Sequence, residues 1–262
     1  MVSTLSMISM GITLLICFVV PILLLWGVRR RYHASFKSFL VGMITFIVAT
    51  QVIEAPIHAY FLMYNETTIQ WFATHPWLYA LYGGLMAGIL EETARYVSFK
   101  WILKKQTRFQ DSLSYGLGHG GIEAMLIVGT TYLNNLVLSL MINQGLVEKL
   151  GLEAELQETI VTQLTQTSPL LFSLAGYERL MTLIIQIGLS VLVFKAIRER
   201  KNYYYAMAIF IHACLDFKAV FAQLGFLNLY WIEGFVTLYA IGFMIFMLKQ
   251  AKFYQEDLSS EK

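Results

Sequence analysis

Residues 5–28 read LSMISMGITLLICFVVPILLLWGV, with no charged side chain anywhere in the stretch. An α-helix rises about 1.5 Å per residue, so about 20 apolar residues cross the roughly 30 Å of hydrocarbon in a bilayer. A cleaved secretory signal has basic residues before its apolar stretch and a small-residue cleavage site after it. Residues 1–4 contain no lysine or arginine, and no small-residue cleavage site follows the stretch before Arg29. It therefore predicts a retained first transmembrane helix.

The composition of the whole chain is that of a membrane protein. Of its 262 residues, 57% are hydrophobic and 14% are charged, whereas soluble domains have about 25% charged residues. The mean hydropathy is +0.60. The net charge is only +2 and no basic cluster with interleaved aromatic residues occurs, so nucleic acid is not an expected partner. Cys17 and Cys214 lie far apart in apolar runs and predict neither a disulfide framework nor a zinc knuckle.

Comparable apolar stretches recur along the chain. We expect an all-α, polytopic transmembrane bundle of about seven helices. No Pro- or Gly-rich linker and no repeat divides the sequence, so residues 1–262 are predicted to form a single integral membrane domain. The predicted helices are residues 5–28, 36–63, 76–103, 110–142, 169–196, 203–224 and 227–248.

Lysines and arginines concentrate in alternate loops, which predicts the orientation of the chain. They follow the first, third and fifth helices and recur in the tail, whereas the other loops have little more than Lys149. Basic loops stay on the cytoplasmic side, so seven helices predict the N-terminus outside and the C-terminus inside a plasma membrane. The basic residues are Arg29, Arg30, Arg31, Lys37, Lys100, Lys104, Lys105, Arg108, Lys195, Arg198, Arg200, Lys201, Lys249, Lys252 and Lys262.

One outer loop has the pattern of an amphipathic helix. Within residues 150–166, Leu152, Leu156, Ile160 and Leu164 are four apart and share a helix face. The segment predicts either a helix lying on the outer membrane interface or a partly ordered helix within a loop.

Three of the predicted helices carry ionisable residues in their apolar interior. Residues 88–96 read GILEETARY, residues 115–123 read YGLGHGGIE and residues 210–216 read FIHACLD. A charged side chain in mid-bilayer costs at least about 2.5–3.5 kcal/mol, so such residues tend to be paired and functional. Within each helix they are three or four apart and share a face. The pairs are Glu91 and Glu92 with Arg95, His119 with Glu123, and His212 with Asp216.

The polar residues of the three helices also fall at matching depths. At about 1.5 Å per residue from the predicted cytoplasmic helix ends, one layer lies roughly 12–14 Å deep and the next roughly 18–20 Å deep. Random placement would scatter these residues, so the sequence predicts a single site within the membrane. The shallower layer holds Arg95, His119 and His212, and the deeper layer holds Glu91, Glu123 and Asp216.

Glycines accompany these residues. Gly84 and Gly88 precede Glu91 as a small-xxx-small pair, which favours close helix packing. Four more glycines surround His119, where they suit either helix packing or space for a substrate backbone. These are Gly116, Gly118, Gly120 and Gly121.

The residue types favour hydrolysis by an activated water. Two adjacent carboxylates in a low-dielectric site resist being ionised together, which suits a glutamate that takes a proton from water and passes it to a leaving amine. Histidines could donate hydrogen bonds to the oxyanion that forms in acyl transfer. The sequence has no Ser-His-Asp constellation, no G-x-S-x-G and no H-E-x-x-H. A serine mechanism is therefore not expected.

The three polar segments resemble the motifs of the CAAX-protease and bacteriocin-processing superfamily of intramembrane proteases. Glu91-Glu92 with Arg95, the aromatic Tyr115 four residues before His119, and the final histidine–aspartate pair carry the resemblance. The segments Glu-Glu-x-x-Arg-Tyr and His-Gly-Gly-x-Glu are most similar to the bacterial YhfC branch. The resemblance covers roughly residues 80–217, and the motif-bearing helices span about residues 76–224.

The resemblance implies an intramembrane endopeptidase that cleaves a membrane-bound peptide or protein. By residue, it implies that Glu91 is the general base, that His119 is its polar partner and that Arg95 holds the glutamate pair. His212 and Asp216 would form the oxyanion side. The catalytic set that the resemblance implies is therefore Glu91, Glu92, Arg95, His119, His212 and Asp216, with Tyr115 and Glu123 in support.

The sequence departs from the superfamily pattern at two places. The arginine comes one residue earlier than in the prenyl-protein proteases, which leaves open whether Glu91 or Glu92 is the base. The third motif ends in Asp216 where many relatives have Asn, and an aspartate donates to an oxyanion only when protonated. No cofactor is favoured. Part of the superfamily has been described as metalloproteases, however, and a divalent metal such as zinc would find plausible ligands in His119, Glu123, His212 and Asp216.

Other polar residues in the helices have structural interpretations. Glu178 and Arg179 favour an ion pair, and Glu54 and His58, four apart, are expected near the outer interface where water is close.

Two other classes of function remain open from the sequence. Acids and histidines within the membrane also suit an ion- or proton-coupled transporter, although no inverted repeat and no Pro-broken helix pair is present. A non-catalytic scaffold subunit is the third possibility. The sequence predicts no oligomeric state.

Overall fold

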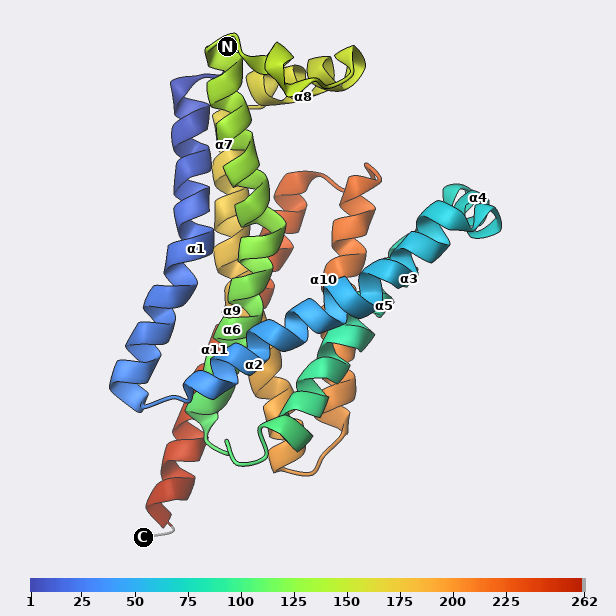
Figure 1. Cartoon of the computed structure of the whole chain (residues 1–262). Helices are drawn as coiled ribbons and strands as arrows, with labels where there is room; N and C mark the ends of the chain where they lie inside the picture. The colour runs from blue at the N-terminus through green and yellow to red at the C-terminus, as the bar shows by residue number, and fades with distance from the viewer. Residues whose placement is uncertain (261–262) are drawn as a thin grey trace. The chain divides into compact units, whose positions relative to one another are not determined.

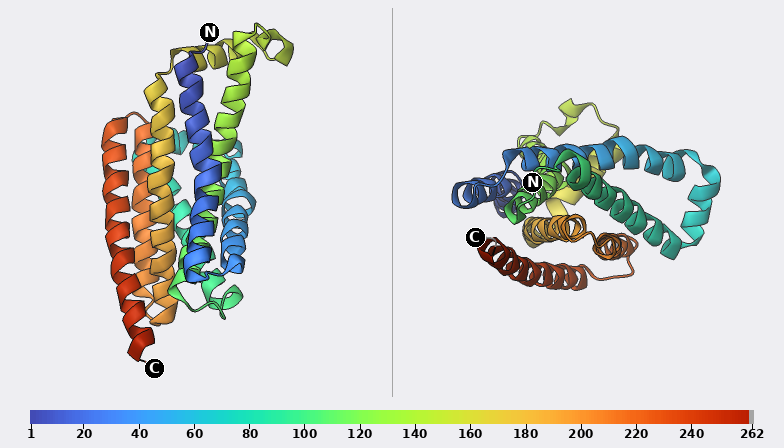
Figure 2. Two further views of the ribbon diagram at one scale, coloured as in Figure 1. Left: turned by 90° about the vertical axis from the view of Figure 1, so that its left-hand side faces the viewer. Right: turned by 90° about the horizontal axis from the view of Figure 1, so that it is seen from below.

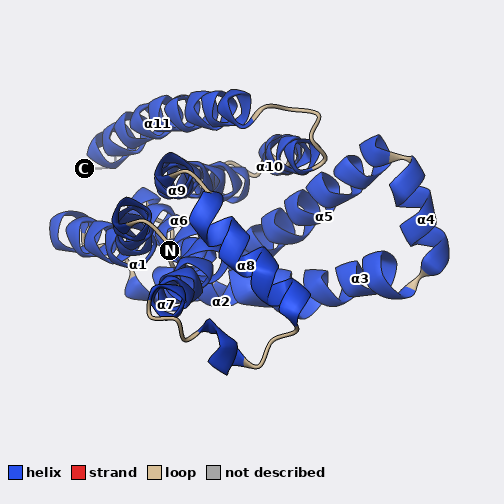
Figure 3. Cartoon of the chain, turned by 90° about the horizontal axis from the view of Figure 1, so that it is seen from above, coloured by secondary structure: helices blue, strands red, loops and turns tan. Residues whose placement is uncertain are grey.

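The computed structural model describes residues 1–260. Within that range every regular element is a helix and no strand occurs (Figure 3). Lys262, one of the basic residues counted in the tail, lies outside the described residues.

The chain contains long helices that are interrupted in places by wider turns (Figure 1). The α-helices are α1 (Thr4–Tyr32), α2 (Phe36–Ile47), α3 (Ala55–Ala59), α4 (Glu66–Thr74), α5 (Pro76–Val97), α6 (Phe109–Ala124), α7 (Thr130–Asn143), α8 (Ala154–Gln166), α9 (Pro169–Arg198), α10 (Tyr203–Gln223) and α11 (Leu229–Ser260). Short π-helical segments continue some of them at Val48–Glu54, Tyr60–Tyr64, Ser98–Ile102 and Met125–Gly129, and Val147–Leu150 forms a 3-10 turn.

The predicted bundle of long helices is confirmed. With the π-helical segments included, the seven predicted helices appear with ends that differ by only a few residues, except that α11 continues to Ser260. Six of the helices described are long and apolar enough to cross a membrane. The remaining one, which begins with α5, is less apolar because it carries Glu91, Glu92 and Arg95. The orientation of the chain stays a prediction.

The described residues form two compact units. Unit 1 comprises Met1–Leu23 and Glu123–Leu180, and unit 2 comprises Leu24–Ile122 and the chain from Met181 onward. The prediction of a single domain stays a prediction.

Unit 1 is built around the first part of α1, which runs beside α7 and the start of α9 (Figure 2). Its apolar core includes Met10, Tyr132 and Phe172, and Thr13 Oγ1 donates a hydrogen bond to the Phe172 carbonyl at 2.7 Å. The predicted amphipathic segment forms α8, whose Leu164 is buried in this core.

Unit 2 depends on close packing between α5 and α10, which run side by side (Figure 1). Gly84 and Gly88 make this approach possible. A Cβ atom on Gly88 would lie 2.9 Å from the Ile209 carbonyl oxygen, and one on Gly84 would collide with the Ala213 carbonyl oxygen. Small residues therefore bring the backbones of α5 and α10 together, as the glycine spacing predicted.

This packing leads to a stability prediction. Gly84→Ala should lower the free energy of unfolding by about 1–3 kcal/mol, because the added methyl group overpacks the contact between α5 and α10. Thermal unfolding in detergent measures the effect. Gly27→Ala is the matched control, since a Cβ there meets nothing within 4 Å and alanine suits a helix better than glycine. Equal losses in the two variants would contradict the packing argument.

The helix that begins with α2 changes its register halfway along. Its buried positions include Gly42, Phe46 and Ala49, which follow ordinary α-helical spacing. The next buried residue is Glu54, five positions after Ala49, and it lies at the end of the π-helical segment. Pro56 comes two residues later and has no backbone N–H for an ordinary helical bond. The wider turn thus brings Glu54 onto the buried face.

Candidate functional site

Helices α5, α6 and α10 bring the predicted polar residues of unit 2 together. Hydrogen bonds or ion pairs join glutamates on α5 to a histidine on α6 and to another on α10. Of the six residues placed in two layers by helix depth, five are in this network, and Glu123 bonds to Arg179 instead. The residues gathered are Glu91, Glu92, Arg95, His119, His212 and Asp216.

Arg95 lies between the two glutamates. Its Nη2 is 3.5 Å from Glu91 Oε2, and its Nε is 3.3 Å from Glu92 Oε1. These pairs follow from the four- and three-residue spacing on α5. Arg95 is completely buried, so its charge is shielded from water and offsets the charge of the two carboxylates.

Two residues that the sequence analysis did not identify hold Arg95 from α9. Its Nη1 donates to the Gln186 carbonyl at 2.9 Å and to Ser190 Oγ at 3.0 Å, and its Nη2 donates to Gln186 Oε1. Gln186 and Ser190 are four apart in an otherwise apolar part of α9. That spacing was the available signal.

His119 contacts Glu91 from α6. Its Nε2 lies 2.8 Å from Glu91 Oε2, and the ring is completely buried. The edge of the Phe46 ring packs against it with centroids 5.0 Å apart, and the Tyr115 ring stacks at 6.1 Å. The imidazole is therefore held in one orientation toward Glu91.

His212 contacts the other glutamate from α10. Its Nδ1 lies 2.7 Å from Glu92 Oε1, so the other ring nitrogen faces away from Glu92. That nitrogen, Nε2, is 3.4 Å from Asp216 Oδ2 and 4.0 Å from Glu91 Oε2. His212 thus links the glutamate pair to Asp216.

Glu91 and Glu92 differ in their exposure to solvent. Glu91 is 6% exposed, whereas Glu92 is completely buried and its Oε2 has no hydrogen-bond partner in the described part of the chain. The Asp216 side chain is 38% exposed. A water molecule approaching the site can therefore reach Glu91 and Asp216 more readily than Glu92.

Tyr115 supports the site through its ring. Its hydroxyl group is 2.7 Å from Thr45 Oγ1 and donates to Ser98 Oγ at 3.4 Å. Neither contact involves a glutamate of the pair. Tyr115 therefore fixes α6 against its neighbours and packs on His119.

Glu123 has a different partner from the one its spacing suggested. It belongs to unit 1, where its Oε1 accepts a hydrogen bond from Arg179 Nη1 at 3.2 Å. Arg179 also bonds to Glu178, so the predicted ion pair exists and includes a third member.

The glycines near His119 take part in helix packing. A Cβ atom on Gly116 would lie 2.5 Å from the Ile187 Cα, and one on Gly120 would lie 2.9 Å from the Gln186 Cβ. A Cβ on Gly118 would collide with the Phe39 carbonyl oxygen. At these three positions, neighbouring helices fill the space that the sequence analysis allowed for a substrate backbone.

The residues predicted as possible metal ligands are not gathered as one set in the described part of the chain. Imidazole nitrogens and carboxylate oxygens are the donors that zinc accepts. Among the residues that the structure describes, however, no three His, Cys, Asp or Glu side chains gather so that they could hold an ion. Glu123 bonds to Arg179, and the cation between the two site glutamates is Arg95.

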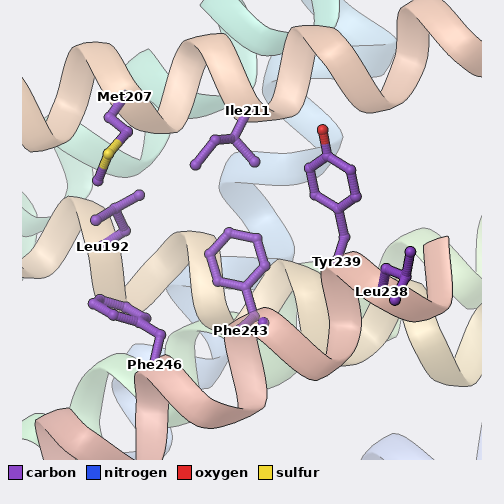
Figure 4. Close-up of a pocket in the computed structure, with 8 residues that line it drawn as sticks. Leu192, Met207, Ile211, Leu238, Tyr239, Phe243 and Phe246 are labelled. Atoms are coloured by element: carbon purple, nitrogen blue, oxygen red, sulfur yellow. The ribbon is translucent and has the colours of Figure 1, made fainter. Parts of the chain in front are cut away.

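A separate pocket opens along α9, α10 and α11 (Figure 4). Its volume is about 460 Å³, and its walls are almost entirely apolar. No carboxylate or imidazole lines it, so it lacks the groups needed for hydrolysis. The lining residues are Leu192, Met207, Ile211, Leu238, Tyr239, Gly242, Phe243 and Phe246.

Comparison with known proteins agrees with the resemblance seen in the motifs. The family model described as "YhfC intramembrane metalloprotease" matches residues 16–237. The "Uncharacterized membrane protein YhfC" of Bacillus subtilis (strain 168) is 34% identical over 259 residues, which cover 97% of this chain and 100% of that protein. No solved structure matches. This chain is a multi-pass membrane protein, and it belongs to the YhfC family of intramembrane proteases.

Proposed function

We propose that the protein is an intramembrane endopeptidase in which Glu91 activates a water molecule to hydrolyse a peptide bond of a membrane-associated protein or peptide. The observation that carries this proposal is the 2.8 Å contact between Glu91 Oε2 and His119 Nε2 beside a second, buried glutamate. Glu91 is the partly exposed member of the pair, which favours it over Glu92 as the base.

In the first step, the water oxygen attacks the carbonyl carbon of the peptide bond. Glu91 takes the proton that the water loses, and the carbonyl oxygen becomes an oxyanion. In the second step the C–N bond breaks, and Glu91 returns the proton to the leaving nitrogen. Such proton transfers contribute about 10²- to 10⁴-fold to the rate of hydrolysis.

His212 is suited to stabilising the oxyanion. An ionised Glu92 can only accept a hydrogen bond, so His212 Nδ1 is the donor in their 2.7 Å contact. Its Nε2 can also donate when the ring carries both protons. Glu91, Glu92 and Asp216 surround the ring and favour that positive charge. A donor aimed at the developing negative charge lowers the barrier to acyl transfer.

Arg95 and Glu92 position the reacting groups. The hydrogen bonds from Arg95 to Gln186 and Ser190 fix the guanidinium group, which in turn holds both carboxylates on one side of α5. Glu92 then sets the ring orientation of His212. These residues act through Glu91 and His212 and need not touch the substrate.

A chelator experiment separates this mechanism from a metal-dependent one, which the family description favours. The purified chain, alone in proteoliposomes, is given a panel of internally quenched transmembrane peptides, and cleavage is followed by fluorescence and mass spectrometry. We expect cleavage to continue at an unchanged rate after dialysis against EDTA and 1,10-phenanthroline, with no stoichiometric metal by elemental analysis. A zinc protease treated in parallel serves as the control.

Loss of activity that returns only with a divalent metal would overturn the glutamate-activated water. Absence of cleavage of every peptide by the purified chain would favour the scaffold interpretation instead.

A further inference from the structure

A second group of polar side chains lies within unit 2, at the end of the π-helical segment Val48–Glu54 and on α3 and α5. His58 Nε2 is 3.0 Å from Glu54 Oε1, and His58 Nδ1 is 2.9 Å from the Tyr82 hydroxyl group. The His58 and Tyr82 rings also meet edge to face at 5.3 Å. The mechanism proposed above uses none of these residues. Glu54 is only 8% exposed, and the placement of Glu54 and His58 near the outer interface stays a prediction.

The helix is distorted in a way that brings Glu54 inward. Ordinary α-helical spacing from the buried Ala49 would bury Ile53, which is instead 44% exposed. The π-helical segment Val48–Glu54 adds one residue to the turn, and Glu54 takes the buried position. Wide turns of this kind inside α-helices are frequent at functional sites. The burial of this carboxylate is therefore a specific feature of the backbone.

Glu54 lies close to Glu91. The helix containing α2 and α3 runs antiparallel to α5, and two contacts fix its height: Lys37 Nζ bonds to the Ile102 carbonyl and His58 bonds to Tyr82. An even rise of about 1.5 Å per residue between these contacts puts Glu54 level with Met86, about 7 Å outward from Glu91 along α5. The π-helical segment that ends at Glu54 packs against α5. An extended peptide covers that distance in about two residues.

Glu54 also differs from the glutamate pair in its charge balance. Arg95 offsets Glu91 and Glu92, whereas no lysine or arginine pairs with Glu54 in the described part of the chain. Its Oε1 contacts His58, and its Oε2 has no hydrogen-bond partner within that part. The carboxylate therefore has both negative charge and an acceptor oxygen available for a ligand.

We propose that Glu54, held by His58, binds an alkylammonium group of the substrate or product near the bond that Glu91 hydrolyses. Two sources have this chemistry: the new amino terminus formed when the C–N bond breaks, and a lysine side chain about two residues from that bond. An ammonium group has three donors and one positive charge, which match the Glu54 carboxylate. This assignment rests on the proposed hydrolysis, but binding of an amine can be measured without it.

The binding test uses octylamine as the probe and octanol as its uncharged counterpart. We expect octylamine to raise the thermal unfolding midpoint of the full-length protein in detergent more than octanol does. Glu54→Gln should raise the octylamine concentration needed for half of that effect by about tenfold or more, as for a lost charge-assisted hydrogen bond. Its response to octanol should not change.

Two further variants keep this test decisive. Glu54→Asp retains the charge and should retain the preference for octylamine, which guards against a folding defect in Glu54→Gln. Glu66→Gln, at an exposed position on α4, should behave like the wild type. An octylamine response that is equal in the wild type and Glu54→Gln, or absent from both, would overturn the proposal, whether or not the protein cleaves peptides.

Cleavage kinetics distinguish the two sources of the ammonium group. Two transmembrane peptides that differ only by lysine or norleucine, two residues beyond the cleaved bond, are compared. If Glu54 binds the lysine side chain, Glu54→Gln should raise KM for the lysine peptide alone. If it binds the new amino terminus after cleavage, the variant should weaken inhibition by the product that carries this terminus, for both peptides. Unchanged kinetics with both peptides would contradict any use of the site during hydrolysis.

Discussion

Glu91→Gln should reduce the rate of peptide hydrolysis by about 100- to 10,000-fold, while the protein remains folded. The amide has nearly the shape of the carboxylate and can still contact His119 Nε2, which lies 2.8 Å from Glu91 Oε2. It cannot accept a proton from water, however. The measurement is kcat for a cleaved transmembrane peptide in proteoliposomes, with the thermal unfolding midpoint recorded for each variant.

Glu92→Gln is the matched control for that experiment. Glu92 is completely buried and contacts Arg95 and His212, so its loss should weaken positioning and reduce kcat less than Glu91→Gln does. The reverse order, with Glu92→Gln inactive and Glu91→Gln near the wild-type rate, would make Glu92 the base. Wild-type rates in both variants would remove the glutamate mechanism.

Arg95→Met should lower the free energy of unfolding by about 3–5 kcal/mol, which is the usual loss when one partner of a buried ion pair is removed. The arginine is completely buried and lies within 3.5 Å of both glutamates. Methionine fills part of its volume but removes the guanidinium charge that lies between the two carboxylates. Thermal and denaturant unfolding in detergent measure the loss.

The double variant Arg95→Met with Glu92→Gln tests the cause of that instability. Removing the charge of the more deeply buried glutamate should restore part of the lost stability, because one uncompensated charge disappears. If the double variant is as unstable as Arg95→Met, the lost contacts of Arg95 with Gln186 and Ser190 explain the effect instead. The destabilisation would then be one of packing and hydrogen bonding.

Much of this architecture was predictable because a bilayer imposes simple rules on a sequence. The apolar runs gave the long helices, and residues three or four apart gave the pairs of Arg95 with Glu91 and Glu92. Matching depth predicted that polar residues of three helices would share one site, and this needed only the rise and periodicity of an α-helix. The pairing of His119 with Glu91 was an implication of the family resemblance.

The remainder depends on which helix lies beside which, and spacing along one helix does not contain that information. Glu123 is four residues from His119, yet it bonds to Arg179, because a buried carboxylate takes the cation that a neighbouring helix offers. The spacing of Gln186 and Ser190 marked a polar face on α9, but it did not indicate that this face would meet Arg95. The inward position of Glu54 requires a π-helical turn, whereas the spacing argument assumed regular α-helical turns throughout.

Because of that wide turn, the helix that contains it can lose one residue within the turn. A chain that lacked one residue between Ala49 and Glu54 could close the segment into ordinary α-helical turns, and the glutamate and His58 would keep their direction. Homologues that differ by a one-residue gap at this point are therefore compatible with the same arrangement of side chains. A gap of one residue on either side of the segment would instead turn all that follows by about 100°.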